Sequence, residues 1–315
     1  MKISIITPCY NEADNIENCI LEVRNVMAEH LSAYEYEHIF TDNASKDNTV
    51  EIIRKFANED HRIKLTINSR NVGPFKNMWN GLKKASGDVI VPMLPADLQD
   101  PPSVIPKFIS LWESGFAIVY GVRINRQESL FLRSMRSIYY RMIQKFANFD
   151  IPRNAGEFMA IDKKVADSLL RLNDEYPYIR GMVARVGVPS AQVEYTWRKR
   201  YSGKSKNSML DLIDQAINGL ISTSKIPARI ALIIGFILSL TGIFAAIVLA
   251  IVLSVHRGEM PIGVPTIMVS ISFFSGIQLL FLGLIGEYVL SMHNQIRPEP
   301  PMYEVESINF DEKRD

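Results

Sequence analysis

The sequence predicts an α/β fold with a doubly wound, mostly parallel sheet, followed by segments that avoid water. In the first half of the chain, apolar runs of strand length alternate with segments of helical spacing. The strand-length runs are almost continuously apolar, which is typical of parallel strands buried on both faces. From Ile230 to Gly286 only Arg257 and Glu259 are charged, so this stretch differs in composition from the rest of the chain.

Each expected element follows from its local pattern. The expected strands are Ile3–Pro8, Tyr36–Thr41, Ile63–Asn68, Val89–Leu94, Phe116–Val122, Glu157–Ile161 and Gln192–Thr196. The expected helices are Asn15–Met27, Thr49–Ala57, Phe75–Ala85, Val104–Trp112 and Leu130–Phe146. In doubly wound sheets ligands bind beyond the carboxyl ends of the strands, so the residues that directly follow each strand are the candidates for a site.

Composition excludes several classes of protein. The 315 residues carry 35 Lys and Arg against 34 Asp and Glu, which excludes a basic nucleic-acid-binding domain, so no nucleic-acid partner is expected. With 47% hydrophobic and 22% charged residues, the chain is not intrinsically disordered. The two cysteines, Cys9 and Cys19, give neither a disulfide framework nor zinc-ligand spacing.

Two uncharged segments have the length needed to cross a membrane. Ile230–Val255 has 26 residues and Met260–Gly286 has 27, whereas a spanning helix needs roughly 20. Only His256–Glu259 separates them, which predicts a hairpin of two transmembrane helices. The alternative is a pair of buried core helices, but the rest of the chain offers little to bury them. Glycines in both segments would allow close helix packing and are compatible with a homo-oligomer.

The flanking sequences set the expected topology and domain limits. Lys and Arg residues gather outside the two apolar segments, with Arg257 alone between them, so both termini are expected in the cytoplasm. Asn207–Ser224 is amphipathic, which fits an interfacial helix or a core-facing one. The expected domains are 1–206 (cytoplasmic domain), 207–227 (interfacial amphipathic helix), 228–292 (two transmembrane helices) and 293–315 (cytoplasmic tail).

Polar clusters follow the first four expected strands. They are Pro8–Glu12, Thr41–Asp47, Asn68–Gly73 and Pro95–Asp100. Each alone could be an ordinary turn or a helix cap. Because the carboxyl ends of parallel strands meet at one edge of the sheet, four such clusters together predict a site there.

A family resemblance runs through almost the whole chain. It is carried by TPCYNEADNI, TDNASKDNT, SRNVGPFKNMWNGLKKASGD, ADLQDPP, VYGVR, AGEFMAID, YSGKSK and the GEY that closes the second apolar segment. In these motifs the sequence resembles the family 2 glycosyltransferases of GT-A fold. More narrowly, it is similar to the membrane-anchored polyprenyl-phosphate glycosyltransferases, a group that includes dolichyl-phosphate mannose synthase and the bacterial undecaprenyl-phosphate glucosyltransferases.

The resemblance implies inverting transfer of a single sugar from a nucleotide sugar to a polyprenyl phosphate such as undecaprenyl phosphate, at the cytoplasmic face of the inner (plasma) membrane. A uridine diphosphate sugar is the favoured donor, and Mg²⁺ or Mn²⁺ is the expected cofactor. Such a cation stabilises the charge that develops on the leaving nucleoside diphosphate. Two alternatives are a non-catalytic membrane scaffold and a processive polysaccharide synthase, although the chain lacks the Gln-x-x-Arg-Trp motif expected of the latter.

The resemblance also implies roles for individual residues. Asp97 and Gln99 are the metal ligands by the family pattern. The residues expected to bind the nucleotide sugar are Pro8, Tyr10, Glu12, Asp42, Arg70 and Asp97. Those expected to bind the acceptor phosphate are Arg123, Arg133 and Ser137. The catalytic candidates are Asp97 and Glu157, with Glu157 orienting the acceptor or sugar or acting as base. Lys204 or Lys206 either closes over the diphosphate or meets anionic lipid headgroups.

Two positions depart from the family pattern. Pro95 stands where the metal motif usually has a first Asp, and Asn43 follows Asp42 where a second Asp is frequent. Both departures remove negative charge near the expected metal and diphosphate. Either the metal is held more by substrate oxygens, or the donor preference is altered, or the activity is weak.

Overall fold

The computed structural model describes residues 1–124, 155–172, 179–200 and 303–310, helix α10 (Val264–Ile296) and part of residues 231–251. The chain divides into two compact units. The first, named the sheet unit below, comprises Met1–Asp214 and Pro298–Asp315, and the second, named the helical unit, comprises Gln215–Arg297. The expected helices at Leu130–Phe146 and Asn207–Ser224 lie outside the described residues.

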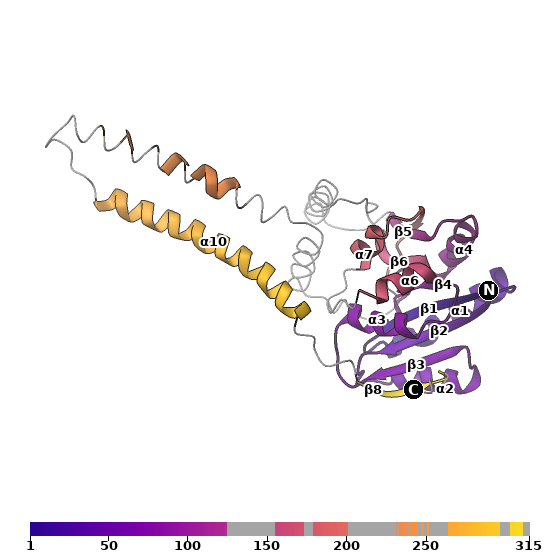
Figure 1. The fold of residues 1–315 in the computed structure, drawn as a ribbon. Coiled ribbons are helices and arrows are strands. Elements are labelled where there is room, and N and C mark those ends of the chain that lie inside the picture. Colours follow the sequence, from indigo (N-terminus) through magenta and orange to yellow (C-terminus); the bar gives the residue numbers. More distant parts are fainter. Residues whose placement is uncertain are drawn as a thin grey trace. The chain divides into compact units, whose positions relative to one another are not determined.

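Eight strands form one sheet in the described part of the sheet unit, in the order β7-β5-β6-β4-β1-β2-β3-β8 (Figure 1). Their bounds are β1 Lys2–Cys9, β2 Glu35–Asp42, β3 Ile63–Asn68, β4 Val89–Val91, β5 Ile118–Ile124, β6 Ala155–Asp162, β7 Ser190–Thr196 and β8 Glu304–Ile308. The pairs β1–β2, β2–β3, β1–β4 and β5–β7 are parallel. Strand β6 runs antiparallel to β4 and β5, and β8 runs antiparallel to β3. The prediction of a mostly parallel α/β sheet is therefore confirmed.

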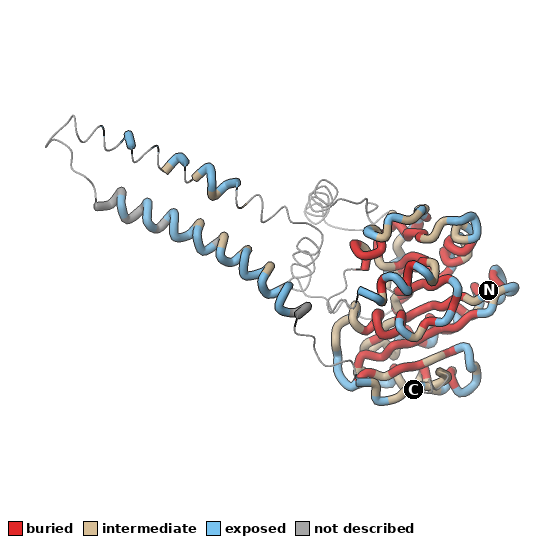
Figure 2. Tube along the Cα trace, viewed as in Figure 1, coloured by how far each residue is buried: buried red, intermediate tan, exposed pale blue. Residues whose placement is uncertain are grey.

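Helices cover both faces of the sheet. Their bounds are α1 Ala13–His30, α2 Thr49–Glu59, α3 Pro74–Lys84, α4 Ile105–Glu113, α6 Lys163–Leu170 and α7 Ile179–Arg185, with a short 3₁₀ turn, η1 (Pro102–Val104), before α4. Apolar residues of α1, α2 and α4 pack on one face, and those of α3, α6 and α7 pack on the other. The two central strands are almost completely buried, as Figure 2 shows in red. This double cover explains why the strand-length runs in the sequence are apolar on both faces.

Strand β4 is shorter than the sequence pattern predicts. It ends at Val91, whereas the apolar run continues to Leu94. Pro92 follows directly and has no N–H to donate, so the ladder is interrupted there. The Leu94 N–H still donates to the carbonyl of Ile6 (2.8 Å), so the chain continues beside β1 until the polar cluster begins.

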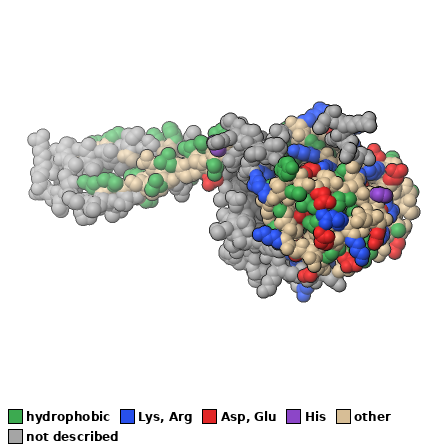
Figure 3. Space-filling model, turned by 90° about the horizontal axis from the view of Figure 1, so that it is seen from below, with side chains coloured by type: hydrophobic (Ala, Val, Ile, Leu, Met, Phe, Trp, Pro, Cys, Tyr) green, Lys and Arg blue, Asp and Glu red, His purple; other side chains and the backbone are tan. Residues whose placement is uncertain are grey.

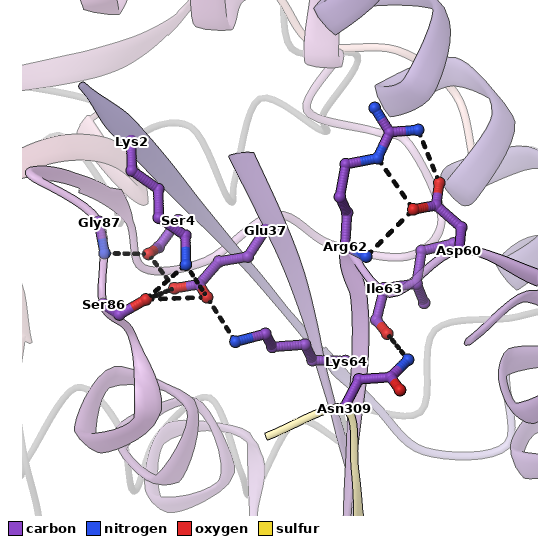
Figure 4. Close-up of polar contacts among 10 residues, drawn as sticks. All are labelled: Lys2, Ser4, Glu37, Asp60, Arg62, Ile63, Lys64, Ser86, Gly87 and Asn309. Atoms are coloured by element: carbon purple, nitrogen blue, oxygen red, sulfur yellow. Dashed lines mark hydrogen bonds and ion pairs between the residues drawn. The ribbon is translucent and has the colours of Figure 1, made fainter. Parts of the chain in front are cut away.

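Buried Glu37 ties the amino ends of the central strands together, as Figure 4 shows. Its carboxylate accepts hydrogen bonds from Ser4 Oγ (2.6 Å) and from the Ser86 N–H (2.7 Å). It also pairs with Lys2 Nζ at 2.8 Å and Lys64 Nζ at 2.9 Å. Burial alone would raise the pKa of Glu37, but the hydrogen bonds from Lys2, Lys64 and Ser4 outweigh it and lower the pKa to about 2. This carboxylate is fully used in holding the strands.

No pattern in the sequence predicted β8, because residues 293–315 read as a tail. The strand Glu304–Ile308 nevertheless pairs with β3 and closes that edge of the sheet. Asn309 Nδ2 fixes its far end by donating to the carbonyls of Ala57 (2.7 Å) and Ile63 (2.8 Å), the second of which appears in Figure 4. An edge strand of this kind gains its stability from pairing with a distant strand rather than from its own composition.

The helical unit contains α10, whose Phe273–Leu290 stretch is long and apolar enough to cross a membrane. None of that stretch is buried, and large apolar side chains such as Phe273 and Leu279 are exposed. Figure 2 shows the described part of α10 mostly in pale blue, and Figure 3 shows hydrophobic side chains of this unit in green. The segment Ile233–Gly242 is a shorter apolar helix, and the Gly235 backbone lies beside the Phe281 ring of α10. Among the described residues α10 alone has spanning length, so the two-helix hairpin remains a prediction.

Candidate functional site

The polar clusters after β1, β2 and β4 each contain one residue with an unusual backbone conformation. Asn11, Ala44 and Leu98 have positive φ angles of 51°, 61° and 56°, the left-handed region that non-glycine residues seldom adopt. All three lie in loops at the carboxyl edge of the sheet. Strained backbone of this type tends to persist at binding sites, where the surrounding structure enforces it. The structure thus singles out the same edge that the sequence predicts.

Hydrogen bonds lock the loop after β1 to the loop after β2. The Asn11 N–H donates to Ser45 Oγ (2.8 Å), and the Lys46 N–H donates to Asn11 Oδ1 (2.7 Å). The Glu12 N–H donates to Thr49 Oγ1 at 2.8 Å. The two loops therefore form one rigid wall, and Glu12 is carried on it.

Asn43 joins the loop after β2 to the loop after β3. Its Nδ2 donates to Asn71 Oδ1 (2.8 Å) and to the carbonyl of Gly73 (3.3 Å), while its Oδ1 accepts from the Val72 N–H (2.9 Å). A carboxylate at position 43 could accept but could not donate. The departure from a paired Asp-Asp motif is therefore explained by a structural task that needs an amide.

Asp42 is completely buried at the end of β2. Its Oδ2 accepts a hydrogen bond from the Ser45 N–H at 2.8 Å. Burial raises the pKa of Asp42 above its ordinary value, and the hydrogen bonds from Ser45 offset this only in part. A buried carboxylate whose pKa is raised in this way is a candidate for a functional site.

Asp97 lies in the loop after β4 and is also buried. Its Oδ1 accepts from the Gln99 N–H (3.2 Å), and its Oδ2 lies 3.6 Å from Arg200 Nε. Arg200 forms a second ion pair with Glu12, so one guanidinium connects the loops after β1 and β4. Burial raises the pKa of Asp97, while Arg200 lowers it by a smaller amount. Sequence patterns assign Arg200 no role beyond flanking charge, because its partners are far away along the chain.

The donor set at Asp97 fits a divalent cation only if a substrate contributes oxygens. Within the described residues no group of three His, Cys, Asp or Glu side chains could hold a metal by itself. Asp97 and the side chain of Gln99 are hard oxygen donors of the kind that Mg²⁺ and Mn²⁺ prefer, and these ions commonly bind through one or two carboxylates plus substrate phosphates. One carboxylate with Pro95 beside it therefore fits a metal held jointly with a diphosphate.

Arg123 on β5 is engaged in a buried network rather than open to solvent. Its Nε and NH2 groups donate to Asp100 at 2.8 Å and 2.5 Å, and Tyr195 Oη donates to the same carboxylate at 2.6 Å. Asp100 is completely buried and the Arg123 side chain is only 16% exposed. The Gly156 backbone packs closely on the guanidinium, since a Cβ at this position would lie only 3.0 Å from Arg123 Cζ. Arg123 is thus strongly fixed in place, and its predicted contact with the acceptor phosphate remains a prediction.

The remaining predicted site residues fall into two groups. Glu157 on β6 pairs with Arg180 Nε of α7 at 2.8 Å, so its carboxylate is oriented by a cation. Pro8 and Tyr10 lie at the end of β1, and Arg70 is exposed in the loop after β3. The residues outside the described part of the chain are Arg133, Ser137, Lys204 and Lys206. The structure therefore gathers Glu12 and Asp97 around Arg200.

Comparison with known proteins gives the class. Residues 4–170 match the model of the Glycosyl transferase family 2, which covers more than half of the chain. This protein therefore belongs to glycosyltransferase family 2, and its mostly parallel sheet is consistent with the GT-A fold that the motifs imply.

Individual relatives align along nearly the full length. The uncharacterized glycosyltransferase YkcC of Bacillus subtilis is 32% identical over 100% of this chain and 96% of its own length. The SfII prophage-derived bactoprenol glucosyl transferase of Shigella flexneri is 31% identical over 95% of this chain and 96% of its own. The undecaprenyl-phosphate 4-deoxy-4-formamido-L-arabinose transferase of Yersinia enterocolitica is 30% identical over 95% of this chain and 91% of its own.

Proposed function

We propose that this protein transfers a single sugar, with inversion, from a uridine diphosphate sugar to a polyprenyl phosphate such as undecaprenyl phosphate. The observation that carries the proposal is the alignment of 95% of the chain with transferases named for bactoprenol and undecaprenyl phosphate. A match to the sheet unit alone would support only a glycosyltransferase. Here the aligned part also includes most of the apolar segments, which suit a lipid acceptor.

The donor binds at the carboxyl edge of the sheet. Buried Asp42 receives hydrogen bonds from the base, and the rigid wall formed by the loops after β1 and β2 supports the ribose near Glu12. Arg70 contributes to the nucleotide end of the pocket. Asp97 and Gln99 would hold Mg²⁺ or Mn²⁺ together with the diphosphate, and a cation bound there would supply positive charge beside the leaving nucleoside diphosphate.

The phosphate of the acceptor lipid has to be positioned for attack more than it has to be activated by a base. The second pKa of a phosphate monoester is about 6, so the lipid phosphate is already anionic at neutral pH. A phosphate oxygen attacks the anomeric carbon from the face opposite the diphosphate; the new C–O bond forms as the bond to the diphosphate breaks. Arg133, Ser137 and Arg123 position the phosphate, because guanidinium groups donate two parallel hydrogen bonds to phosphate oxygens. Glu157, held by Arg180, orients the sugar or the acceptor.

The protein is integral to the inner membrane, with the sheet unit and both termini in the cytoplasm. Exposed apolar side chains along α10 support membrane insertion, and the surplus of Lys and Arg outside the apolar segments supports the orientation. A cysteine introduced between His256 and Glu259 should react with an impermeant thiol reagent in intact cells. Reaction only after lysis would contradict this orientation.

The direct test uses purified full-length protein in detergent, undecaprenyl phosphate and a panel of radiolabelled nucleotide sugars with Mg²⁺ or Mn²⁺. We expect one uridine diphosphate sugar to give a labelled product that extracts into organic solvent and depends on the lipid phosphate. Absence of extractable product with every donor, despite measurable nucleotide binding, would instead favour the non-catalytic scaffold.

A further inference from the structure

The chain directly before β8 makes a hydrogen bond to the loop after β3, in addition to the β3–β8 ladder. The Tyr303 carbonyl accepts a hydrogen bond from the Ser69 N–H (2.9 Å), and Ser69 is the first residue after β3. The β3–β8 ladder is irregular between Ile67 and Asn68, directly before that point. The loop that reaches Asn71 and Val72, which Asn43 binds, therefore starts from a backbone position fixed by β8.

Glu304 of β8 begins a chain of hydrogen bonds that ends beside Asp42. Burial raises the pKa of Glu304, and interactions that include the Asn80 side chain lower it. Asn80 Nδ2 donates to Asn68 Oδ1 at 3.0 Å. Asn68 Nδ2 donates to Asn77 Oδ1 at 2.7 Å, and Asn77 Nδ2 donates to the carbonyl of Thr41 at 2.6 Å. The three asparagines, named the asparagine relay below, are all buried.

The asparagine relay constrains the donor edge because Asn68 and Asn77 each use both an amide N–H and the amide oxygen. Buried polar networks of this kind hold one geometry when complete and become costly when one partner is lost. Thr41 directly precedes Asp42, and Asn68 directly precedes the Ser69–Gly73 loop. Removing the anchor at Glu304 therefore affects the two loops that carry the proposed nucleotide contacts Asp42 and Arg70.

The same strand supplies a matched control. Glu304 pairs with Lys84 Nζ of α3 at 2.7 Å, and Glu306 pairs with Arg54 of α2, also at 2.7 Å. Both are partly exposed glutamates with one cationic partner, 28% and 41% exposed. Of these two glutamates, within the described residues, only Glu304 interacts with the asparagine relay. The two positions thus separate a local ion pair from a contact that reaches the site.

We propose that β8 is a positioning element for the nucleotide site, with Glu304 as its positioning residue, so that the segment following α10 in the chain sets the affinity for the donor. This inference rests on the proposed function for the identity of the ligand. In chain order, β8 is the first described part of the sheet unit after α10, separated from it by residues 297–303. The strand that follows the apolar helix is therefore linked through Glu304 to the loop of Asp42.

The test compares Glu304→Ala with Glu306→Ala in the purified full-length protein. We expect Glu304→Ala to weaken uridine diphosphate binding, measured by calorimetry, by about fivefold or more. The Michaelis constant for the nucleotide sugar should rise in step, while that for undecaprenyl phosphate stays unchanged. Glu306→Ala should leave all three values near wild type. Glu304→Gln, which keeps an oxygen for Asn80, should recover most of the affinity.

A second readout needs no nucleotide. Amide hydrogen exchange at Val72, whose N–H donates to Asn43 Oδ1, should be faster in Glu304→Ala than in Glu306→Ala. Equal exchange and equal nucleotide affinity in the two alanine variants would overturn the inference even if both lowered the melting temperature. If the wild type binds no uridine nucleotide but exchange still differs, the proposed function fails while the link from β8 to the loops stands.

Discussion

Buried carboxylates at the two ends of the central strands have pKa values shifted in opposite directions. At the amino end, Glu37 forms ion pairs with two lysines and accepts hydrogen bonds from two serines, and its pKa is lowered to about 2. At the carboxyl end, Asp42 and Asp97 are also buried, but burial outweighs their hydrogen bonds and raises the pKa of both. The difference makes Asp42 and Asp97, rather than Glu37, the candidates for binding a ligand.

One loop at the carboxyl end contains both kinds of acid. Asp100 is satisfied by Arg123 and Tyr195, whereas Asp97 three residues earlier has only the Gln99 N–H and a guanidinium at 3.6 Å. The comparison therefore predicts that substitutions at satisfied acids reduce stability, and that substitutions at under-compensated acids reduce activity.

Asp100→Ala should have the largest effect. It leaves the guanidinium of Arg123 without its carboxylate in a buried site, which costs about 3–5 kcal/mol of unfolding free energy. Denaturant unfolding followed by tryptophan fluorescence can measure this, since Trp79, Trp112 and Trp197 all lie in the sheet unit. As a control, Tyr195→Phe removes one hydroxyl and should cost only about 1 kcal/mol. Equal losses in the two variants would contradict the assignment of Arg123 and Asp100 as the central pair.

Asp97→Asn should lower sugar transfer by a factor of about 10²–10³, the size of effect seen when a group that stabilises transition-state charge is removed. Its free energy of unfolding should stay near wild type or rise, because an uncompensated buried charge is gone. Transfer is measured as organic-extractable label, with Asp167→Asn on the partly exposed acid of α6 as control. Full activity of Asp97→Asn would mean that the metal site lies elsewhere.

Glu37→Gln should lose stability and keep activity. A carboxylate whose folded pKa is about 2, against 4.5 unfolded, contributes about 3 kcal/mol above pH 4.5. That contribution disappears as the pH falls from 4.5 toward 2. Wild-type stability should therefore fall across this range more steeply than that of Glu37→Gln. Parallel pH profiles for the two proteins would refute the role of Glu37.

Pro95→Asp should have the smallest effect and the most specific one. It restores the first carboxylate of the usual metal motif, so Mn²⁺ binding to nucleotide-free protein, followed by electron paramagnetic resonance, should tighten by about tenfold. Turnover need not rise, because tighter ground-state binding accelerates nothing by itself. With uridine diphosphate present, wild type and variant should differ less, since diphosphate oxygens then complete the metal shell. A wild-type metal affinity that ignores the nucleotide would contradict this shared site.

Sequence patterns within short stretches were enough to predict most strands of the sheet and the edge at which the polar clusters gather. Continuous apolar runs identified the parallel strands, and the polar residues after them identified the edge of the sheet that holds Glu12, Asp42 and Asp97. These inferences succeed because strand burial and loop chemistry are recorded in neighbouring residues. Motif resemblance supplied the family, and the match over residues 4–170 confirms it.

Tertiary structure alone decided the features that depend on residues far apart in the chain. Arg200 reaches Glu12, Glu306 reaches Arg54, and Asn43 needs an amide because of Asn71 in another loop. Strand β8 exists because β3 offers an unpaired edge, which no feature of residues 304–308 records. Local sequence fixes which chemical groups are present at each strand end, but only folding brings distant groups close enough to set their charge and their partners.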